Sequence, residues 1–206
     1  MRSTQPVSKI FGWDRGIPID RYYIEYFLKK NQNYIQGKVL EIAESKYSKQ
    51  FGTGVTSFEI LHVEQRSNVT IVGDLTKLES LPRNTIDCFI CTQVLNFIYD
   101  FHKAIEGAHH LLKPEGVMLA TVSGISQISR YDADRWGHFW SFYPQGIERA
   151  FKRVFGEHNV EVTAYGNSLS AISFVKGIAH QELTEAELNF HDADYPVTIT
   201  IVARKA

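Results

Sequence analysis

The feature that most constrains the fold is a series of short apolar runs with helical or turn-forming stretches between them. The runs cover residues 39–43, 55–61, 69–72, 86–91, 116–122, 159–165 and 196–204. Each is rich in β-branched or other apolar residues and is short for a helix, so each predicts a strand. Strands that alternate with helices are typical of an open α/β sheet.

Helical periodicity and end signals fill most of the intervals. The stretch before Lys113-Pro114-Glu115-Gly116 is a helix with one apolar stripe, and it joins the fourth strand to the fifth. Such a crossover makes neighbouring strands parallel. We therefore expect an open α/β sheet of seven strands with helices between them. The expected helices are 18–30, 100–112, 144–155, 167–179 and a short turn begun by Thr184 and Glu187, which have capping-box spacing.

Composition narrows the class of protein. With 206 residues, 44% of them hydrophobic, the chain can build one sizeable core. Lysine plus arginine (22) nearly equal aspartate plus glutamate (23), and no basic stripe occurs, which argues against nucleic acid as a partner. Two cysteines and no signal-peptide pattern predict a cytoplasmic protein, and no run approaches the roughly 20 apolar residues of a membrane span.

The carboxyl ends of the predicted strands are the places to look for a ligand site, because open parallel sheets bind ligands there. The first strand delivers Glu41, and Glu59 follows eighteen positions later, near the spacing at which an acid binds a ribose in dinucleotide sites. Glu41 could instead cap the neighbouring turn, and Glu59 could face solvent on a strand edge.

The third and fourth strands end in further polar groups. Asp74 and Leu75 follow the third strand, and an aspartate there can lie beside an adenine amine or simply make a turn. Thr92 and Gln93 follow the fourth. We expect all four residues to belong to a cofactor site with Glu41 and Glu59.

The series VLEIA, VTSFE, TIVGDL, IDCFICTQVLNFIYD and AIEGAHHLLKPEGVMLATVSG resembles the successive motifs of class I S-adenosylmethionine-dependent methyltransferases over residues 37–125. The tracts FGWDRGIPIDRYYIEYFL, YDADRWGHFWSFYP and YGNSLSAISFVKGIAHQEL resemble a bacterial subgroup associated with glycans and glycosyltransferases. The resemblance implies S-adenosylmethionine as cofactor and a seven-stranded, Rossmann-like, mostly parallel sheet with helices on both faces and an antiparallel last strand. It also implies a single methyltransferase-like domain over 1–206. Within it, 1–35 would be an N-terminal loop and helix cap, 36–125 the cofactor-binding half and 126–206 the acceptor-side half.

The loop after the first strand departs from the family pattern. Ala43, Ser45 and Tyr47 stand where the family places glycines, which allow the backbone to approach a ligand. S-adenosylmethionine has no pyrophosphate, so its loop depends less on glycine than a dinucleotide loop does. We therefore keep Ala43 and Ser45 as cofactor-binding candidates.

The tract after the fifth strand is rich in aromatic and titratable residues and is the candidate acceptor wall. His138 and Asp134 are the catalytic candidates, because methyl transfer to a hydroxyl gains from a base. Trp136 and Trp140 are acceptor-binding candidates, since aromatic faces also pack on sugar rings. From the N-terminal segment we add Arg15 and Tyr22 to the acceptor site, with Arg15 or Arg21 expected to hold a carboxylate or phosphate.

No metal site is expected. Cys88 and Cys91 lie inside one apolar strand without a second ligand pair, which indicates core residues, and the adjacent His109 and His110 point to different faces of a helix. The predicted function is S-adenosylmethionine-dependent methylation, at oxygen, of a small-molecule or glycan-type acceptor. The alternative is a catalytically silent module that binds partner enzymes; a nicotinamide-dependent oxidoreductase would need the missing glycines more. A homodimer or a glycosyltransferase partner is the expected assembly.

Overall fold

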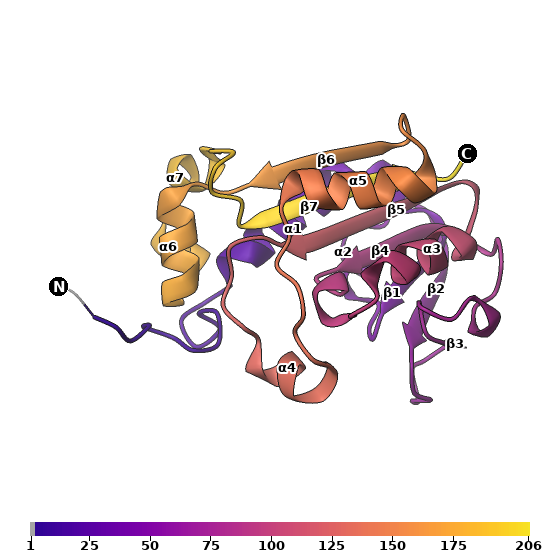
Figure 1. Ribbon diagram of the computed structural model, residues 1–206, viewed down its shortest axis with the longest axis horizontal. Helices are drawn as coiled ribbons and strands as arrows, with labels where there is room; N and C mark the ends of the chain where they lie inside the picture. Colours follow the sequence, from indigo (N-terminus) through magenta and orange to yellow (C-terminus); the bar gives the residue numbers. More distant parts are fainter. Residues whose placement is uncertain (1–2) are drawn as a thin grey trace.

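The computed structural model describes residues 3–206, which form one seven-stranded sheet in the order β3-β2-β1-β4-β5-β7-β6 with helices on both faces (Figure 1). Neighbouring strands are parallel up to β5, and β7 runs antiparallel to both β5 and β6. This confirms the predicted fold class, including the antiparallel last strand. The strands are β1 Gly37–Ile42, β2 Val55–His62, β3 Ile71–Val72, β4 Ile86–Thr92, β5 Leu112–Ser123, β6 Val160–Tyr165 and β7 Thr198–Arg204.

The edge strand β3 is shorter than the apolar run predicted. Only two residues pair with β2, because Thr70, just before the strand, bonds to β2 partly through its side chain. The Thr70 hydroxyl accepts the Ile60 N–H at 2.9 Å, in place of a backbone carbonyl. A short edge strand offers few unpaired backbone groups to other chains.

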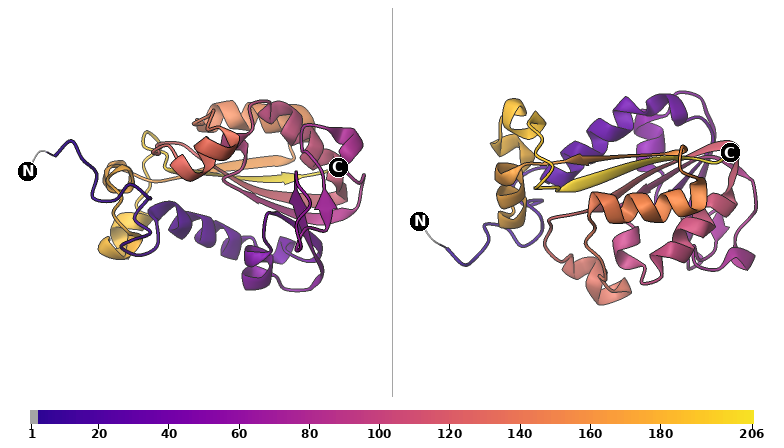
Figure 2. Two further views of the ribbon diagram at one scale, coloured as in Figure 1. Left: turned by 90° about the horizontal axis from the view of Figure 1, so that it is seen from below. Right: turned by 45° about the horizontal axis from the view of Figure 1, so that its top comes forward.

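Two α-helices were not predicted from the sequence: α2, in the loop after β1, and α4, in the aromatic tract. In Figure 2, α1 and α2 cover one face of the sheet, whereas α3 and α5 cover the other. No helix among residues 3–206 is long and apolar enough to cross a membrane. The α-helices are α1 Ile19–Lys30, α2 Lys46–Phe51, α3 Phe101–Leu111, α4 Arg130–Trp136, α5 Pro144–Phe155, α6 Ser168–Lys176 and α7 Glu185–Asn189, and the 3-10 helices are η1 Gln32–Tyr34, η2 Leu78–Ser80, η3 Leu95–Phe97 and η4 His180–Glu182.

The central strands are buried on both faces, so alternate residues enter two different cores. Met118 and Ala120 of β5 pack with α3 and α5, whereas Val117 and Leu119 pack with α1. The same alternation separates Cys91, in the first core, from Cys88, in the second. Both cysteines are fully buried and free, as the sequence indicated.

A third core lies beyond the carboxyl edge of the sheet, where α6, α7 and the start of α1 meet. Tyr23 of α1 packs there with Phe174 of α6. The N-terminal segment joins this cluster through the Val7 N–H, which donates to the Lys176 carbonyl at 2.8 Å. Gly177 ends α6 at φ +74°, and a Cβ there would lie 2.4 Å from the Ser8 carbonyl oxygen. The glycine therefore allows the N-terminal segment to run close to the carboxyl ends of the strands.

Candidate functional site

A cavity of about 1180 Å³ opens at the carboxyl edge of the parallel strands. A residue at or just after the end of each of the first five strands lines it: Ala43, His62, Asp74, Gln93 and Ser123. Single-ligand pockets usually enclose about 300–1,000 Å³. The cavity therefore has room for a nucleoside cofactor and a second small molecule.

The turn after β1 takes a conformation that favours glycine, although it contains none. Ala43 has φ +66°, in the left-handed region, which costs a residue with a Cβ about 1–2 kcal/mol. Its N–H donates to the Leu61 carbonyl at 3.1 Å, which ties the turn to β2. Ala43 and Tyr47 line the cavity, whereas the buried Ser45 does not.

Glu41 lies beneath this turn and holds the start of α2. Its carboxylate accepts the backbone N–H groups of Tyr47 at 3.1 Å and Ser48 at 2.7 Å, together with the Ser48 hydroxyl at 2.5 Å. Burial raises the pKa of Glu41, and the hydrogen bonds from Ser48 and Tyr47 oppose that rise. Glu41 also lines the cavity, so the capping role that the sequence left open is present at the candidate cofactor site.

Glu59 is not brought to the cavity. It lies three residues before the end of β2, where Ser57 Oγ donates to it at 2.7 Å and Lys38 lies 3.4 Å away. The acid that follows the end of β2 is Glu64, whose N–H donates to Nδ1 of His62 at 2.9 Å and whose carboxylate pairs with Arg66 at 3.0 Å. The count from Glu41 places the predicted acid within the strand, and neither Glu59 nor Glu64 is among the residues that line the cavity.

The ends of β3 and β4 bring all four of their predicted residues to the cavity: Asp74, Leu75, Thr92 and Gln93. Burial disfavours the charged form of Asp74, but hydrogen bonds from the Thr76 N–H (2.9 Å) and hydroxyl (2.8 Å) and the nearby Lys77 outweigh it and lower the pKa. Gln93 has φ +56°, and its buried Nε2 has no hydrogen-bond partner among the described residues. A strained residue with an unused donor at a strand end is a candidate ligand contact.

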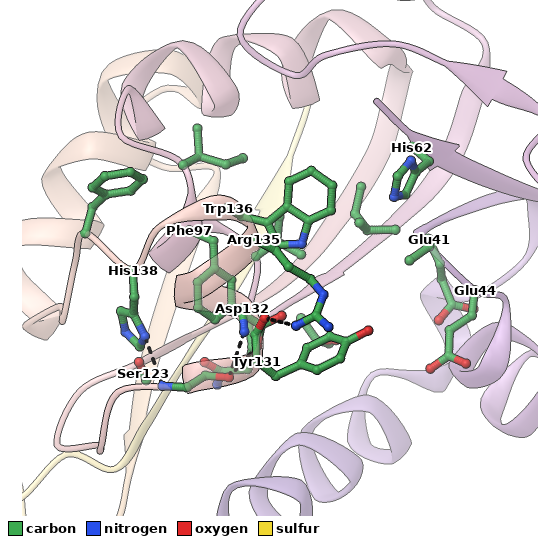
Figure 3. Close-up of a pocket in the computed structure, with 18 of the residues that line it drawn as sticks. Glu41, Glu44, His62, Phe97, Ser123, Tyr131, Asp132, Arg135, Trp136 and His138 are labelled. Carbon is green, nitrogen blue, oxygen red and sulfur yellow. Dashed lines mark hydrogen bonds between the residues drawn. The ribbon is translucent and has the colours of Figure 1, made fainter. Parts of the chain in front are cut away.

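The opposite wall of the cavity comes from α4 and the chain that follows it. In Figure 3, His138, Ser123 and Asp132 lie across the cavity from Glu41 and Glu44. Asp132 is held in this position by the cap of α4. The Ser129 hydroxyl oxygen accepts the Asp132 N–H at 3.4 Å, and the Ser129 hydroxyl donates to the Asp132 carboxylate at 2.6 Å.

His138 is held by two contacts. The Ser129 N–H donates to its Nδ1 at 3.3 Å, and its ring meets Phe97 edge to face at 4.9 Å between centroids. Burial lowers the pKa of His138, with Asp132 opposing and Arg130 adding to that effect. A neutral ring that accepts at Nδ1 carries its proton on Nε2, so His138 can offer a donor to a ligand.

Trp136 also lines this wall, and its ring meets His62 edge to face at 5.8 Å. Trp140 does not line the cavity. Its Nε1 donates to the carbonyls of Ile98 at 3.2 Å and Tyr99 at 3.1 Å, and its ring packs on the core, which is a structural role.

Three other candidates lie outside the cavity. Asp134 is exposed and faces Arg130 at 3.7 Å, whereas Asp132, two residues earlier, lines the wall. Arg15 forms a two-pronged pair with Glu182, through Nε at 2.9 Å and Nη2 at 2.5 Å. The Tyr22 hydroxyl donates to Asn189 at 3.0 Å.

The N-terminal segment also contributes residues to the cavity, and of these Arg21 was named from the sequence as a carboxylate or phosphate contact, whereas Asp20 was not. Phe11 and Trp13 of this segment line the cavity. Asp20 and Arg21, in the first turn of α1, line it as well. Residues 3–206 hold no group of three or more His, Cys, Asp or Glu side chains that could bind a metal ion.

Comparison with known proteins agrees with the resemblance seen in the sequence. Residues 36–120 match the family model described as a methyltransferase domain. A comparison with curated protein sequences gave no significant match. The family match covers the strands whose ends carry Glu41, Asp74 and Gln93.

Solved structures with the same fold include several methyltransferases. A SAM dependent methyltransferase from Archaeoglobus fulgidus has a TM-score of 0.56 at 13% identity, over 90% of this chain and 94% of that one. The N-methyltransferase NodS from Bradyrhizobium japonicum, solved with S-adenosylhomocysteine, has a TM-score of 0.55 at 12% identity, over 97% and 93%. The [4+2]-cyclase SpnF has 0.55 at 15% identity, over 90% and 81%. Identities this low show the fold alone, and the family match together with the fold supports an S-adenosylmethionine-dependent methyltransferase.

Proposed function

We propose that this protein transfers a methyl group from S-adenosylmethionine directly to a hydroxyl of a small-molecule or glycan-type acceptor. The observation that carries the proposal is the cavity of about 1180 Å³, which runs from the β1–β4 ends of the matched region to the aromatic wall at α4. Polar groups that have no hydrogen-bond partner among residues 3–206 line the cavity, including Nε2 of Gln93 and Oδ1 of Asp20, and they fit a polar nucleoside ligand.

The cofactor half would lie over the ends of β1 to β4. Asp74 and Leu75 are proposed to contact the adenine, and Thr92 and Gln93 the middle of the cofactor. For the ribose we propose Glu64, because it follows the carboxyl end of β2 whereas Glu59 lies within the strand.

The acceptor half would lie against α4. When bound, the cofactor supplies a methyl group on a sulfonium, so the chain needs mainly to position the acceptor oxygen in line with that methyl. His138 would orient the acceptor by donating from Nε2. The Asp132 carboxylate would take the hydroxyl proton, since it lines the cavity and Asp134 does not.

The glycan-type acceptor rests on the aromatic rings of this wall. Trp136 is 41% exposed and Phe139 46% exposed, and both line the cavity. Large apolar side chains left open to solvent in a cavity mark a binding surface. Flat aromatic faces of this kind suit a sugar ring.

The binding test is a calorimetric titration of the protein with S-adenosylhomocysteine, S-adenosylmethionine and NAD. We expect both sulfur ligands to bind and NAD to bind weakly or not at all. Glu64→Gln should weaken binding, whereas Glu59→Gln, the same change at an acid within β2, should leave the affinity unchanged. No heat with either sulfur ligand at millimolar concentration would reject the proposal.

The transfer test follows tritium from methyl-labelled S-adenosylmethionine into a panel of hydroxyl compounds that includes mono- and oligosaccharides. Asp132→Asn should slow transfer by about 100-fold or more. Asp134→Asn is the control and should not. His138→Ala should slow transfer and spare S-adenosylhomocysteine binding.

A catalytically silent module that binds partner enzymes is the second candidate. Ala43 in place of a glycine, at φ +66°, favours it, because its Cβ stands where the backbone would approach a cofactor. The fold also does not fix the reaction, as the cyclase among the similar structures indicates. Absence of sulfur-ligand binding would support this candidate.

A further inference from the structure

The first turn of α1 places two opposite charges on the cavity wall without pairing them. Asp20 and Arg21 are adjacent and half-buried, and both line the cavity. Oδ1 of Asp20 is enclosed and has no hydrogen-bond partner within residues 3–206. Neither side chain forms an ion pair within 4.0 Å in that part of the chain.

An unpaired charge out of water costs free energy, so two beside each other call for an explanation. Burial raises the pKa of Asp20, while Arg21 and the backbone N–H groups of the turn oppose that rise. The Asp20 carboxylate also interacts favourably with the positive end of the α1 dipole. A carboxylate exposed to solvent would do the same, so the dipole does not explain why this oxygen is enclosed. The enclosed oxygen therefore points to a missing partner.

Arg21 is held in place by α2. Its Nη1 donates to the Tyr47 hydroxyl at 2.9 Å, which leaves most of its five N–H donors free. The exposed Glu44 is another acid on this wall, yet it pairs with nothing within 4.0 Å among the described residues. A carboxylate ligand would give Arg21 the two parallel hydrogen bonds that a guanidinium favours.

The neighbouring groups cannot take this role. The backbone N–H groups of Tyr47 and Ser48, which would be free donors at the start of α2, already bind Glu41. The oxygens of Glu41 are occupied by the same bonds and by the Ser48 hydroxyl. The turn after β1 thus has little left to offer a zwitterion, and α1 supplies both charges.

We propose that Asp20 binds the α-ammonium group and Arg21 the α-carboxylate of the amino-acid end of the cofactor. This assignment rests on the proposed function. It also explains how a glycine-poor turn can serve a nucleoside with an amino-acid tail: the tail is held by side chains of α1 and not by the turn's backbone.

The test compares S-adenosylhomocysteine with methylthioadenosine. Both contain the same nucleoside and an uncharged thioether sulfur, but methylthioadenosine lacks the amino-acid end. Calorimetry on the full chain should show that the wild type prefers S-adenosylhomocysteine. Asp20→Asn and Arg21→Gln should each weaken S-adenosylhomocysteine binding by about 10- to 100-fold, the value of a charged hydrogen bond or two. Their affinity for methylthioadenosine should not change.

Control variants remove charges nearby but off the cavity wall. Asp14→Asn and Lys29→Gln alter exposed residues before and at the end of α1, and both should bind like the wild type. Retained binding of methylthioadenosine shows that a variant is folded. If both nucleosides bind and the two variants weaken both equally, or weaken neither, the assignment of Asp20 and Arg21 is overturned and the proposed function stands. If the wild type binds neither nucleoside, the proposed function itself is rejected, and the assignment with it.

Discussion

Replacing Glu41 with alanine tests whether this residue joins β1 to α2 or only borders the cavity. The change removes the acceptor of three hydrogen bonds and leaves the N–H groups of Tyr47 and Ser48 unsatisfied. Each buried donor without a partner costs about 1–3 kcal/mol. The cavity lets water reach part of the gap, so we expect a loss of about 3 kcal/mol in the free energy of unfolding.

A loss of that size lowers Tm by about 6–12 °C in a chain of this length. Differential scanning calorimetry measures it, with Glu44→Ala as the control: Glu44 is three residues away, exposed and on the same cavity, and its side chain makes no hydrogen bond or ion pair within residues 3–206. A Glu41→Ala protein that melts with the wild type and the control would refute the capping role.

The difference in stability between the wild type and Glu41→Ala should depend on pH. The ordinary pKa of Glu41 is 4.5, and burial raises it in the folded state. A raised pKa means that the folded protein holds this proton more tightly than the unfolded chain, so stability falls as pH rises through the folded pKa. The stability gap between wild type and Glu41→Ala should therefore be largest below pH 4.5 and narrower above the folded pKa; a gap that widens with pH would contradict the raised pKa.

Three further changes test other parts of the site. Ala43→Gly should keep or slightly raise the free energy of unfolding, because relief of the left-handed strain (about 1–2 kcal/mol) offsets the entropy of glycine (about 0.5–1 kcal/mol). The control is Ala186→Gly, in the helix α7, which should lower the free energy of unfolding by up to about 1 kcal/mol. If urea unfolding shows the same loss for both variants, Ala43 is not strained. A pH titration of His138 by NMR should give a pKa below 6.5, because burial disfavours the charged ring, and a neutral ring protonated at Nε2. A pKa above 6.5 would contradict the lowering by burial. Arg15→Ala should raise the pKa of Glu182 from about 2, because the hydrogen bond and the charge of Arg15 hold that pKa low. The same change should speed proteolysis of the N-terminal loop and leave S-adenosylhomocysteine binding unchanged.

Much of the cavity lining at the β1–β4 ends could be predicted because it depends on strand ends. A parallel strand delivers the residues after it to one edge of the sheet, so Asp74, Leu75, Thr92 and Gln93 needed only the strand boundaries. Glu59 shows the limit of this reasoning. A count from the first strand placed the acid three residues before the end of β2, and an acid within the strand does not reach the edge.

The wall of the cavity at α4 depends on helix geometry that the sequence did not reveal. Successive residues on a helix point about 100° apart, so residues two positions apart, such as Asp132 and Asp134 on α4, lie on roughly opposite faces. The sequence favoured Asp134, whereas the cap at Ser129 turns Asp132 to the cavity. The rings of Trp136 and Trp140 were equivalent candidates until packing placed the second one on the core.

The sequence by itself determined the order of the seven strands and of every α-helix except α2 and α4, since apolar periodicity and helix-ending residues are local signals. The family resemblance added the antiparallel β7. Only the tertiary structure decided that Asp20 and Arg21 reach the cavity, because α1 must first pack on α6 and the sheet for its first turn to lie beside the β1 end. Contacts between residues far apart in the chain depend on how whole elements pack, and no local pattern records that.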